Sequence, residues 1–283
     1  MKTKVALIYD FDKTLCSKDM QEYSFIPNLN MTSSTFWNEV SNFTKEEKMD
    51  KILGYMYMMI KKSQEINKDI TIPYLNSLGS SVELFPGVLN WFNNINEYGK
   101  KIDLEIEHYI VSSGIKEIIE GTSIAKYFKE IYACEFLYVN NVAVWPKQSI
   151  NYTAKTQYIS RINKGVLDIA DDVTLNKMMS DDERRISSKN MIYFGDGLTD
   201  IPSMKMTRSY GGYAIAVYQN NDTKLVKELI NENRIDFYAK ANYNENEELD
   251  KIVKTILNDI STKTKLNNLH KKQINDTKSM SIV

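Results

Sequence analysis

The sequence has few of the residues on which several common kinds of functional site depend. Its 283 residues include two histidines, His108 and His270, and two cysteines, Cys16 and Cys134. Two histidines so far apart argue against a Ser-His-Asp triad and against a His-rich zinc site. Two cysteines do not form a disulfide framework, which fits a reducing compartment.

The sequence also lacks long apolar runs and a strong net charge. The formal net charge of -1 gives no overall attraction to nucleic acid or to an anionic membrane. The apolar stretch at residues 52–60 is far shorter than a membrane span, and the run at residues 5–9 is too short for a signal-peptide core. We therefore expect a cytoplasmic protein that binds neither nucleic acid nor membranes.

Short apolar runs alternate with helical patterns along most of the chain. The runs at residues 5–9, 108–111, 191–194 and 214–218 have the length and composition of buried strands. Helical patterns follow them, and this alternation predicts an α/β fold with a Rossmann-like, doubly wound parallel sheet covered on both faces. The pattern at residues 131–144 predicts a hairpin that turns at Asn140-Asn141. The pattern at residues 152–163 predicts a helix that ends near Gly165. The last twenty residues are polar and predict a peripheral helix or tail.

Residues 18–85 show no alternating strand pattern. Their apolar residues recur at helical spacing, as in Phe36, Val40 and Phe43, after possible caps at Ser33, Ser34 and Thr35. We therefore expect a discontinuous core, residues 1–17 and 86–283, with a helical insertion at residues 18–85.

Polar residues follow three of the predicted strands. Asp10 and Asp12 follow the first, Ser112 and Ser113 the second, and Asp196 with Asp200 a later one. The carboxyl ends of parallel strands form one edge where ligands bind, so residues scattered along the chain should meet there. Asp10 and Asp12 would repel each other, and a cation or a division of catalytic labour would explain the pair; a polar strand end in solvent is the alternative.

Several aspartates with a hydroxyl group and no histidine suit a hard cation, and Mg²⁺ is the natural candidate. Asp196 and Asp200 lie in a Gly-rich turn that opens a helix, where an N-cap is the alternative explanation. The turn at residues 112–114, also expected at a helix start, could bind an anion or simply cap the helix. Lys155 could hold phosphate, although a surface lysine is the default interpretation.

Taken in order, these segments resemble the four motifs of the haloacid dehalogenase (HAD) superfamily. They are Asp-Phe-Asp-Lys-Thr-Leu at residues 10–15, the strand ending in Ser112, Lys155, and Gly-Asp-Gly-Leu-Thr-Asp at residues 195–200. The insertion resembles the C1-type cap of phosphoserine phosphatase-like members. Many members have glycine at the position of Lys13. Lys155 lies further from the fourth motif than in most C1-capped members, so Lys147 and Lys164 remain alternatives.

The resemblance implies a role for each matching residue. Asp10 would be the nucleophile, and Asp12 would protonate the leaving alcohol and then deprotonate water. The residues implied to hold the phosphoryl oxygens are Thr14, Ser112, Ser113 and Lys155. The groups implied to bind Mg²⁺ are Asp10, the backbone carbonyl of Asp12, and Asp196, with Asp200 in support.

The expected activity is Mg²⁺-dependent hydrolysis of a small phosphorylated metabolite through an aspartyl phosphate. A phosphotransferase or phosphomutase of the same superfamily, or a non-catalytic phosphate-binding protein, is the alternative. Asp19 and Glu22 are candidate substrate-selecting residues. Asp19 occupies a position where related phosphoserine phosphatases carry an acid that meets the substrate amine, which suggests an amine-bearing substrate.

Overall fold

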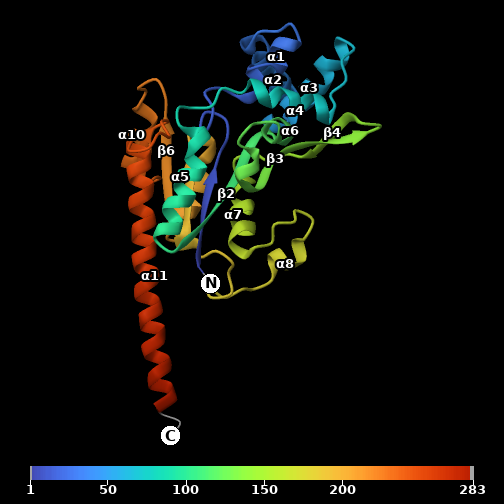
Figure 1. The fold of residues 1–283 in the computed structure, drawn as a ribbon. Coiled ribbons are helices and arrows are strands. Elements are labelled where there is room, and N and C mark those ends of the chain that lie inside the picture. Colours follow the sequence, from blue (N-terminus) through green and yellow to red (C-terminus); the bar gives the residue numbers. More distant parts are fainter. Residues whose placement is uncertain (1, 281–283) are drawn as a thin grey trace.

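The computed structural model describes residues 2–280 and has a single seven-stranded sheet with helices around it (Figure 1). The strands are β1 Thr3–Tyr9, β2 Leu104–Ile115, β3 Phe128–Val139, β4 Val142–Gln148, β5 Met191–Gly195, β6 Tyr213–Tyr218 and β7 Phe237–Lys240. The α-helices are α1 Phe25–Asn28, α2 Ser33–Glu46, α3 Lys51–Glu65, α4 Ile72–Leu78, α5 Val88–Lys101, α6 Lys116–Glu120, α7 Lys155–Lys164, α8 Asp172–Asn176, α9 Ile201–Ser209, α10 Lys224–Asn231 and α11 Glu248–Met280.

Strand β1 lies at the centre of the sheet, whose order is β4-β3-β2-β1-β5-β6-β7. All neighbouring strands are parallel except β3 and β4, which pair antiparallel. Residues 5–9 of β1 are completely buried, as expected for a parallel strand covered on both faces. The chain runs from β1 through β2 and β3 to β4 on one side of the sheet and then returns to β5, β6 and β7 on the other side, so a switch point lies at the carboxyl end of β1. The predicted α/β fold is confirmed.

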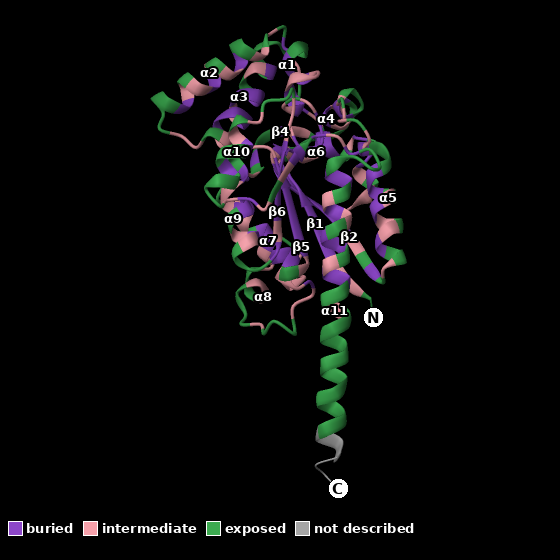
Figure 2. Ribbon diagram, turned by 90° about the vertical axis from the view of Figure 1, so that its left-hand side faces the viewer, coloured by how far each residue is buried: buried purple, intermediate pink, exposed green. Residues whose placement is uncertain are grey.

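Helices cover both faces of the sheet (Figure 2). Helices α7 and α9 pack on one face, and α5 with the first half of α11 packs on the other. The second half of α11 continues beyond the body of the molecule, away from the carboxyl ends of the strands, and is exposed. The predicted peripheral C-terminal helix is therefore present, as a continuation of one long helix rather than as a separate element.

The segment at residues 18–85 forms α1 to α4 and two short 3-10 turns, Met20–Glu22 and Gly79–Ser81. These helices lie together above the carboxyl ends of the strands (Figure 1). Asp50 caps α3 by accepting hydrogen bonds from the backbone N–H groups of Ile52 and Leu53. No helix within residues 2–280 is both long enough and apolar enough to cross a bilayer.

Two turns match the sequence predictions, and one does not. The β3–β4 hairpin turns at Asn140 and Asn141, whose φ angles of 50° and 67° suit the tight turn. Helix α7 ends at Gly165, which has a φ of 78°. Strand β2, however, continues through residues 112–114 to Ile115, so these residues do not open a helix as predicted. The pairing of β2 with β3 is irregular between Val111 and Ile115, which separates this segment from a regular strand.

Candidate active site

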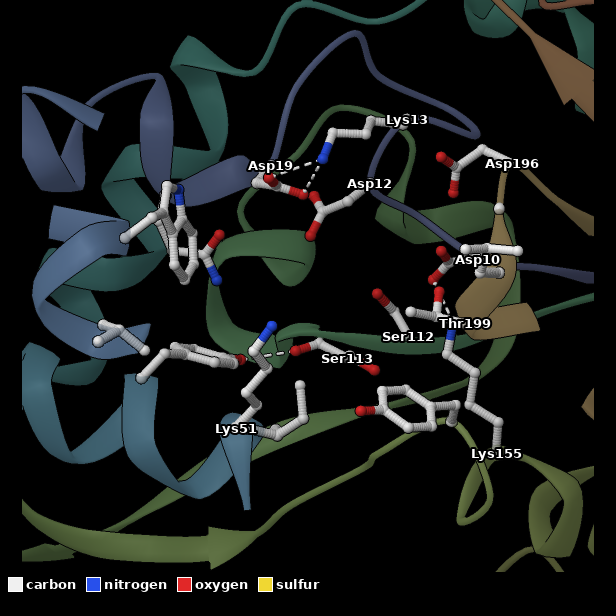
Figure 3. A pocket seen from close by; sticks show the side chains of 18 of the residues that line it. Asp10, Asp12, Lys13, Asp19, Lys51, Ser112, Ser113, Lys155, Asp196 and Thr199 are labelled. Atoms are coloured by element: carbon white, nitrogen blue, oxygen red, sulfur yellow. Dashed lines mark hydrogen bonds and ion pairs between the residues drawn. The ribbon is translucent and has the colours of Figure 1, made fainter. Parts of the chain in front are cut away.

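A cavity of about 710 Å³ lies between the carboxyl ends of the strands and the helices of residues 18–85. One side of it, called here the acidic side, carries Asp10, Asp12, Asp196 and Lys155 (Figure 3). The other, called the helical side, is formed by residues of α2 and α3. The residues of the helical side are Trp37, Val40, Lys51, Ile52 and Tyr55.

Lys155 forms ion pairs with two buried aspartates, Asp10 and Asp200. Its Nζ lies 2.9 Å from Asp10 Oδ1 and 2.8 Å from Asp200 Oδ1. Asp200 Oδ1 also accepts a hydrogen bond of 2.7 Å from the Tyr193 hydroxyl. Lys155 is 1% exposed and Asp200 is completely buried, so these charges are removed from water and held by one another.

The acidic side has more negative than positive charge in a buried place. Burial raises the pKa of Asp10 to about 6, with Lys155 lowering it and Asp200 raising it. Burial, followed by the charges of Asp200 and Asp10, raises the pKa of Asp196 well above its usual value. Burial alone would lower the pKa of Lys155, but Asp10 and Asp200 raise it well above the usual lysine value. One charged lysine faces three carboxylates, and a cation bound there would relieve their repulsion.

The oxygen atoms of the acidic side fit a divalent cation. One carboxylate oxygen from each of Asp10, Asp196 and Asp200 lies within 4.8 Å of the others. Asp200 Oδ2 is buried and, among the described residues, has no hydrogen-bond partner. Gly195 leaves room for this carboxylate, since a Cβ at that position would lie 2.4 Å from Asp200 Cγ. A set of oxygen ligands without nitrogen or sulfur is typical of Mg²⁺.

Asp12 faces the cavity but is held apart from the oxygen cluster. Its Oδ1 accepts a hydrogen bond of 2.8 Å from the Met20 backbone N–H. Burial, then the charges of Asp19 and Asp10, raises the pKa of Asp12 well above its usual value. The raised pKa favours the protonated form of Asp12, which is the form that can donate a proton.

The chain makes a tight turn at Lys13, between Asp12 and the insertion at residues 18–85. Lys13 has a left-handed φ of 57°, a conformation that glycine adopts without strain. Its ammonium group donates to both carboxylate oxygens of Asp19, at 2.9 and 2.8 Å. Asp19 lines the cavity, and its negative charge is offset by Lys13, which donates to both of its oxygens.

Three predicted residues have surroundings that differ from the prediction. The Thr14 side chain is completely buried and is not part of the cavity lining, and its hydroxyl has no hydrogen-bond partner among the described residues. The Ser113 hydroxyl donates to the Ile150 carbonyl oxygen at 2.6 Å, and the Ser113 carbonyl oxygen accepts from the Tyr55 hydroxyl at 2.6 Å. Glu22 lies outside the cavity lining and accepts a hydrogen bond from Trp37 Nε1 at 2.8 Å. For Ser113 and Glu22, a hydrogen-bond partner from another segment determines where the side chain points.

Ser112 and Lys155 lie where the sequence placed them, beside Asp10. Ser112 is 1% exposed, lines the cavity, and accepts a hydrogen bond from the Gly114 N–H at 3.0 Å, so its own proton can be donated. The two alternative lysines are elsewhere. Lys147 pairs with Glu135, and Lys164 donates to two backbone carbonyls.

Comparisons with known proteins agree with this geometry. The family described as "Putative Phosphatase" matches residues 5–257. The chain belongs to this phosphatase family. A Borreliella burgdorferi protein named "Uncharacterized protein" is 29% identical over 267 residues, which cover 84% of this chain and 91% of that protein.

Two solved structures show the same fold as this phosphatase. A HAD family hydrolase from Salmonella enterica serovar Typhi superposes with a TM-score of 0.55 at 17% identity, covering 85% of this chain and 69% of that one. A phosphoserine phosphatase, solved as an analogue of its phospho-aspartyl intermediate, superposes with a TM-score of 0.53 at 14% identity, covering 90% of this chain and 99% of that one. The fold is that of the HAD hydrolases.

Several residues of the site were not identified from the sequence. Tyr193 lies within β5, where it reads as an ordinary core residue, and only the fold turns its hydroxyl toward Asp200. Thr199 lies on the acidic side (Figure 3), and its place between Asp196 and Asp200 in the last motif was the available signal. Trp37, Lys51 and Tyr55 reach the cavity through the packing of α2 and α3, for which the sequence pattern gave no specific signal.

Proposed function

We propose that the protein is a Mg²⁺-dependent phosphomonoester hydrolase that acts on a small phosphorylated metabolite through an aspartyl phosphate. The observation that carries this proposal is the buried arrangement of Asp10, Lys155 and Asp200 beside a separate carboxyl group, Asp12, whose pKa burial raises. Residues 18–85 act as a cap that closes the cavity and excludes water during the reaction. Residues 1–17 and 86–283 form the catalytic core.

Asp10 is the nucleophile of the first step. One of its carboxylate oxygens forms a bond to phosphorus while the bond from phosphorus to the alcohol oxygen breaks. Lys155 and the Ser112 hydroxyl hold the phosphoryl oxygens and balance their charge. Asp10, Asp196, Asp200 and the backbone carbonyl of Asp12 would hold Mg²⁺, which would supply positive charge to offset the negative charge of the phosphoryl group.

Asp12 serves both steps. In the first it gives its proton to the departing alcohol oxygen, for which its raised pKa prepares it. In the second, as a carboxylate, it takes a proton from water while the water oxygen bonds to phosphorus. The bond to Asp10 then breaks, phosphate leaves, and Asp10 is again a carboxylate.

The decisive experiment separates these two steps in the Asp12→Asn variant. With an aryl phosphate, whose leaving group needs little protonation, the first step should survive while the second is slowed roughly 10²–10⁴-fold. Rapid-quench mass spectrometry should then find a phosphate-sized adduct on a peptide that contains Asp10. The double variant Asp10→Asn, Asp12→Asn is the matched control and should carry no adduct. An adduct on another residue would contradict the proposed mechanism, in which Asp10 is the nucleophile.

The dependence on metal is tested separately. Phosphate release by the parent protein should stop when a chelator is present in excess and return when Mg²⁺ is added back. Full activity in excess chelator would contradict the assignment of Asp10, Asp196 and Asp200 as a metal site.

A further inference from the structure

The helical side of the cavity has an unpaired positive charge. In Figure 3 the Lys51 side chain extends into the cavity, on the side away from Asp10, Lys155 and Thr199. Within residues 2–280, no carboxylate pairs with its ammonium group. A charged group that points into a cavity without a partner is available for a ligand.

Three carboxylates of the segment at residues 18–85 already have partners. Asp19 is held by Lys13 through both oxygens. Glu22 accepts from the Trp37 indole N–H. Asp50 caps α3 with one oxygen and accepts from Asn151 Nδ2 at 3.1 Å with the other. The part of the cavity beyond the acidic side therefore offers a ligand a free cation and no free anion.

Helix α3 itself gives no reason for a lysine at this position. Lys51 is the first residue of α3, where a positive charge is slightly unfavourable for the helix dipole. It is exposed, so its removal leaves no cavity in the core. A contact with a ligand would explain the residue, whereas a contribution to folding would not.

The other residues nearby complete a site for the leaving group. Trp37, Val40 and Ile52 supply an apolar wall. Gln21 also lines the cavity, is 2% exposed, and has a buried amide oxygen with no hydrogen-bond partner among the described residues. A cavity of about 710 Å³ has space for a leaving group much larger than a two-carbon alcohol.

We infer that the leaving group of the substrate carries an anionic group, a carboxylate or a second phosphate, which Lys51 binds. This inference rests on the proposed phosphatase activity and adds the substrate class. It replaces the amine-bearing substrate suggested by Asp19. The substrate is a phosphomonoester with an apolar body, its phosphate beside Asp10 and its second anion at Lys51.

The test uses aryl phosphates that differ in one substituent. They are 4-carboxyphenyl phosphate, its neutral isostere 4-carbamoylphenyl phosphate, 4-(aminomethyl)phenyl phosphate and 1,4-phenylene bisphosphate. For the parent protein, kcat/KM should be about 10- to 100-fold higher for the best anionic ester than for the carbamoyl ester. The carboxyl and bisphosphate compounds decide between the two kinds of anion.

Three variants assign the preference to Lys51. Lys51→Met should lower kcat/KM for the anionic esters far more than for the carbamoyl ester, so that the preference disappears, and it should leave the melting temperature unchanged. Lys51→Glu should shift the preference to the aminomethyl ester. Lys45→Met removes an exposed lysine of α2 that does not line the cavity, and it should behave as the parent.

The outcomes separate this inference from the activity on which it rests. Release of phosphate from no ester would remove the proposed function and the inference with it. Release from all esters without an anionic preference, or with a preference that persists in Lys51→Met, would overturn the inference alone. A preference of the parent for the aminomethyl ester would also overturn it, and would return the substrate-binding role to Asp19.

Discussion

The two sides of the cavity are built in different ways. The acidic side stands on strand ends of a buried sheet, where Asp10 is fixed to β5 by a hydrogen bond of 2.9 Å from its N–H to the Phe194 carbonyl. The helical side consists of side chains from α2 and α3, and several of these, including Trp37 and Lys51, are partly or largely exposed. The difference implies a division of labour, in which the sheet holds the reacting groups rigidly and the helices select the substrate. The predictions below test this division.

Asp10→Asn should have the largest effect on activity. The amide keeps the shape of the side chain but is a poor nucleophile, so kcat should fall by about 10⁴-fold or more. The fold should be retained because burial already disfavours the charged form of Asp10. Steady-state phosphate release and thermal unfolding, measured on the same sample, check both expectations. Turnover close to that of the parent would end the assignment of the nucleophile.

Asp196→Asn should weaken binding of the metal by more than about 100-fold, because it replaces a charged ligand. Calorimetric titration with Mg²⁺ measures the affinity directly, without relying on turnover. The control is Asp222→Asn, an exposed aspartate after β6 that lies outside the cavity lining. Unchanged affinity in Asp196→Asn would show that this carboxylate is not a ligand.

Tyr193→Phe tests how far the acidic side depends on the hydrogen bond from the Tyr193 hydroxyl to Asp200. The Tyr193 hydroxyl and Lys155 both donate to Asp200 Oδ1, which leaves Oδ2 toward the cluster. Loss of the hydroxyl should weaken Mg²⁺ binding by about 10- to 100-fold, with a smaller effect on kcat at saturating metal. Equal Mg²⁺ affinities of variant and parent in a calorimetric titration would mean that Lys155 alone positions Asp200.

The stability of the folded protein should also depend on pH, through His108 in the sheet. Burial lowers the pKa of His108 from 6.5 to about 3. The Tyr9 hydroxyl accepts from the Trp91 N–H at 2.9 Å and lies 3.2 Å from His108 Nδ1, to which it donates in the tautomer whose Nε2–H donates to Asn96 Oδ1. Below pH 6.5 the unfolded chain binds a proton that the folded protein excludes, so stability falls as pH falls toward 3. The expected loss is about 2 kcal/mol between pH 7 and pH 5.

Denaturant unfolding at several pH values measures this loss. His108→Gln should be less stable than the parent at pH 7 but should lose less stability on acidification. An equal slope for the two proteins would assign the pH dependence to other groups.

Asp19→Asn should have the smallest effect. The Lys13–Asp19 pair has side-chain exposures of 40% and 29%, and such pairs contribute only about 0.2–1 kcal/mol. We expect less than about a fivefold change in kcat/KM for a small aryl phosphate and for its aminomethyl derivative alike. A larger loss confined to the aminomethyl ester would mean that Asp19 leaves Lys13 to bind an amine.

The sequence by itself determined the parts of the site that follow from strand ends and motif spacing. Apolar runs before Asp10 and Asp196 were enough to predict a parallel sheet, because a buried parallel strand must be apolar on both faces. The same strands then bring Asp10, Ser112 and Asp196 to one edge, whatever their separation in sequence. The turn at Asn140-Asn141 and the helix end at Gly165 could also be predicted, since local backbone conformation limits which residues fit.

Only the tertiary structure decided which side chains face the cavity and which are held by other partners. Thr14 has the residue type expected for phosphate binding but is buried, Asp19 is paired with Lys13, and Glu22 is bound to Trp37. Tyr193 became part of the site because β5 places its hydroxyl beside Asp200. Such contacts depend on register and packing between segments far apart in the chain, and local sequence patterns carry no information about them.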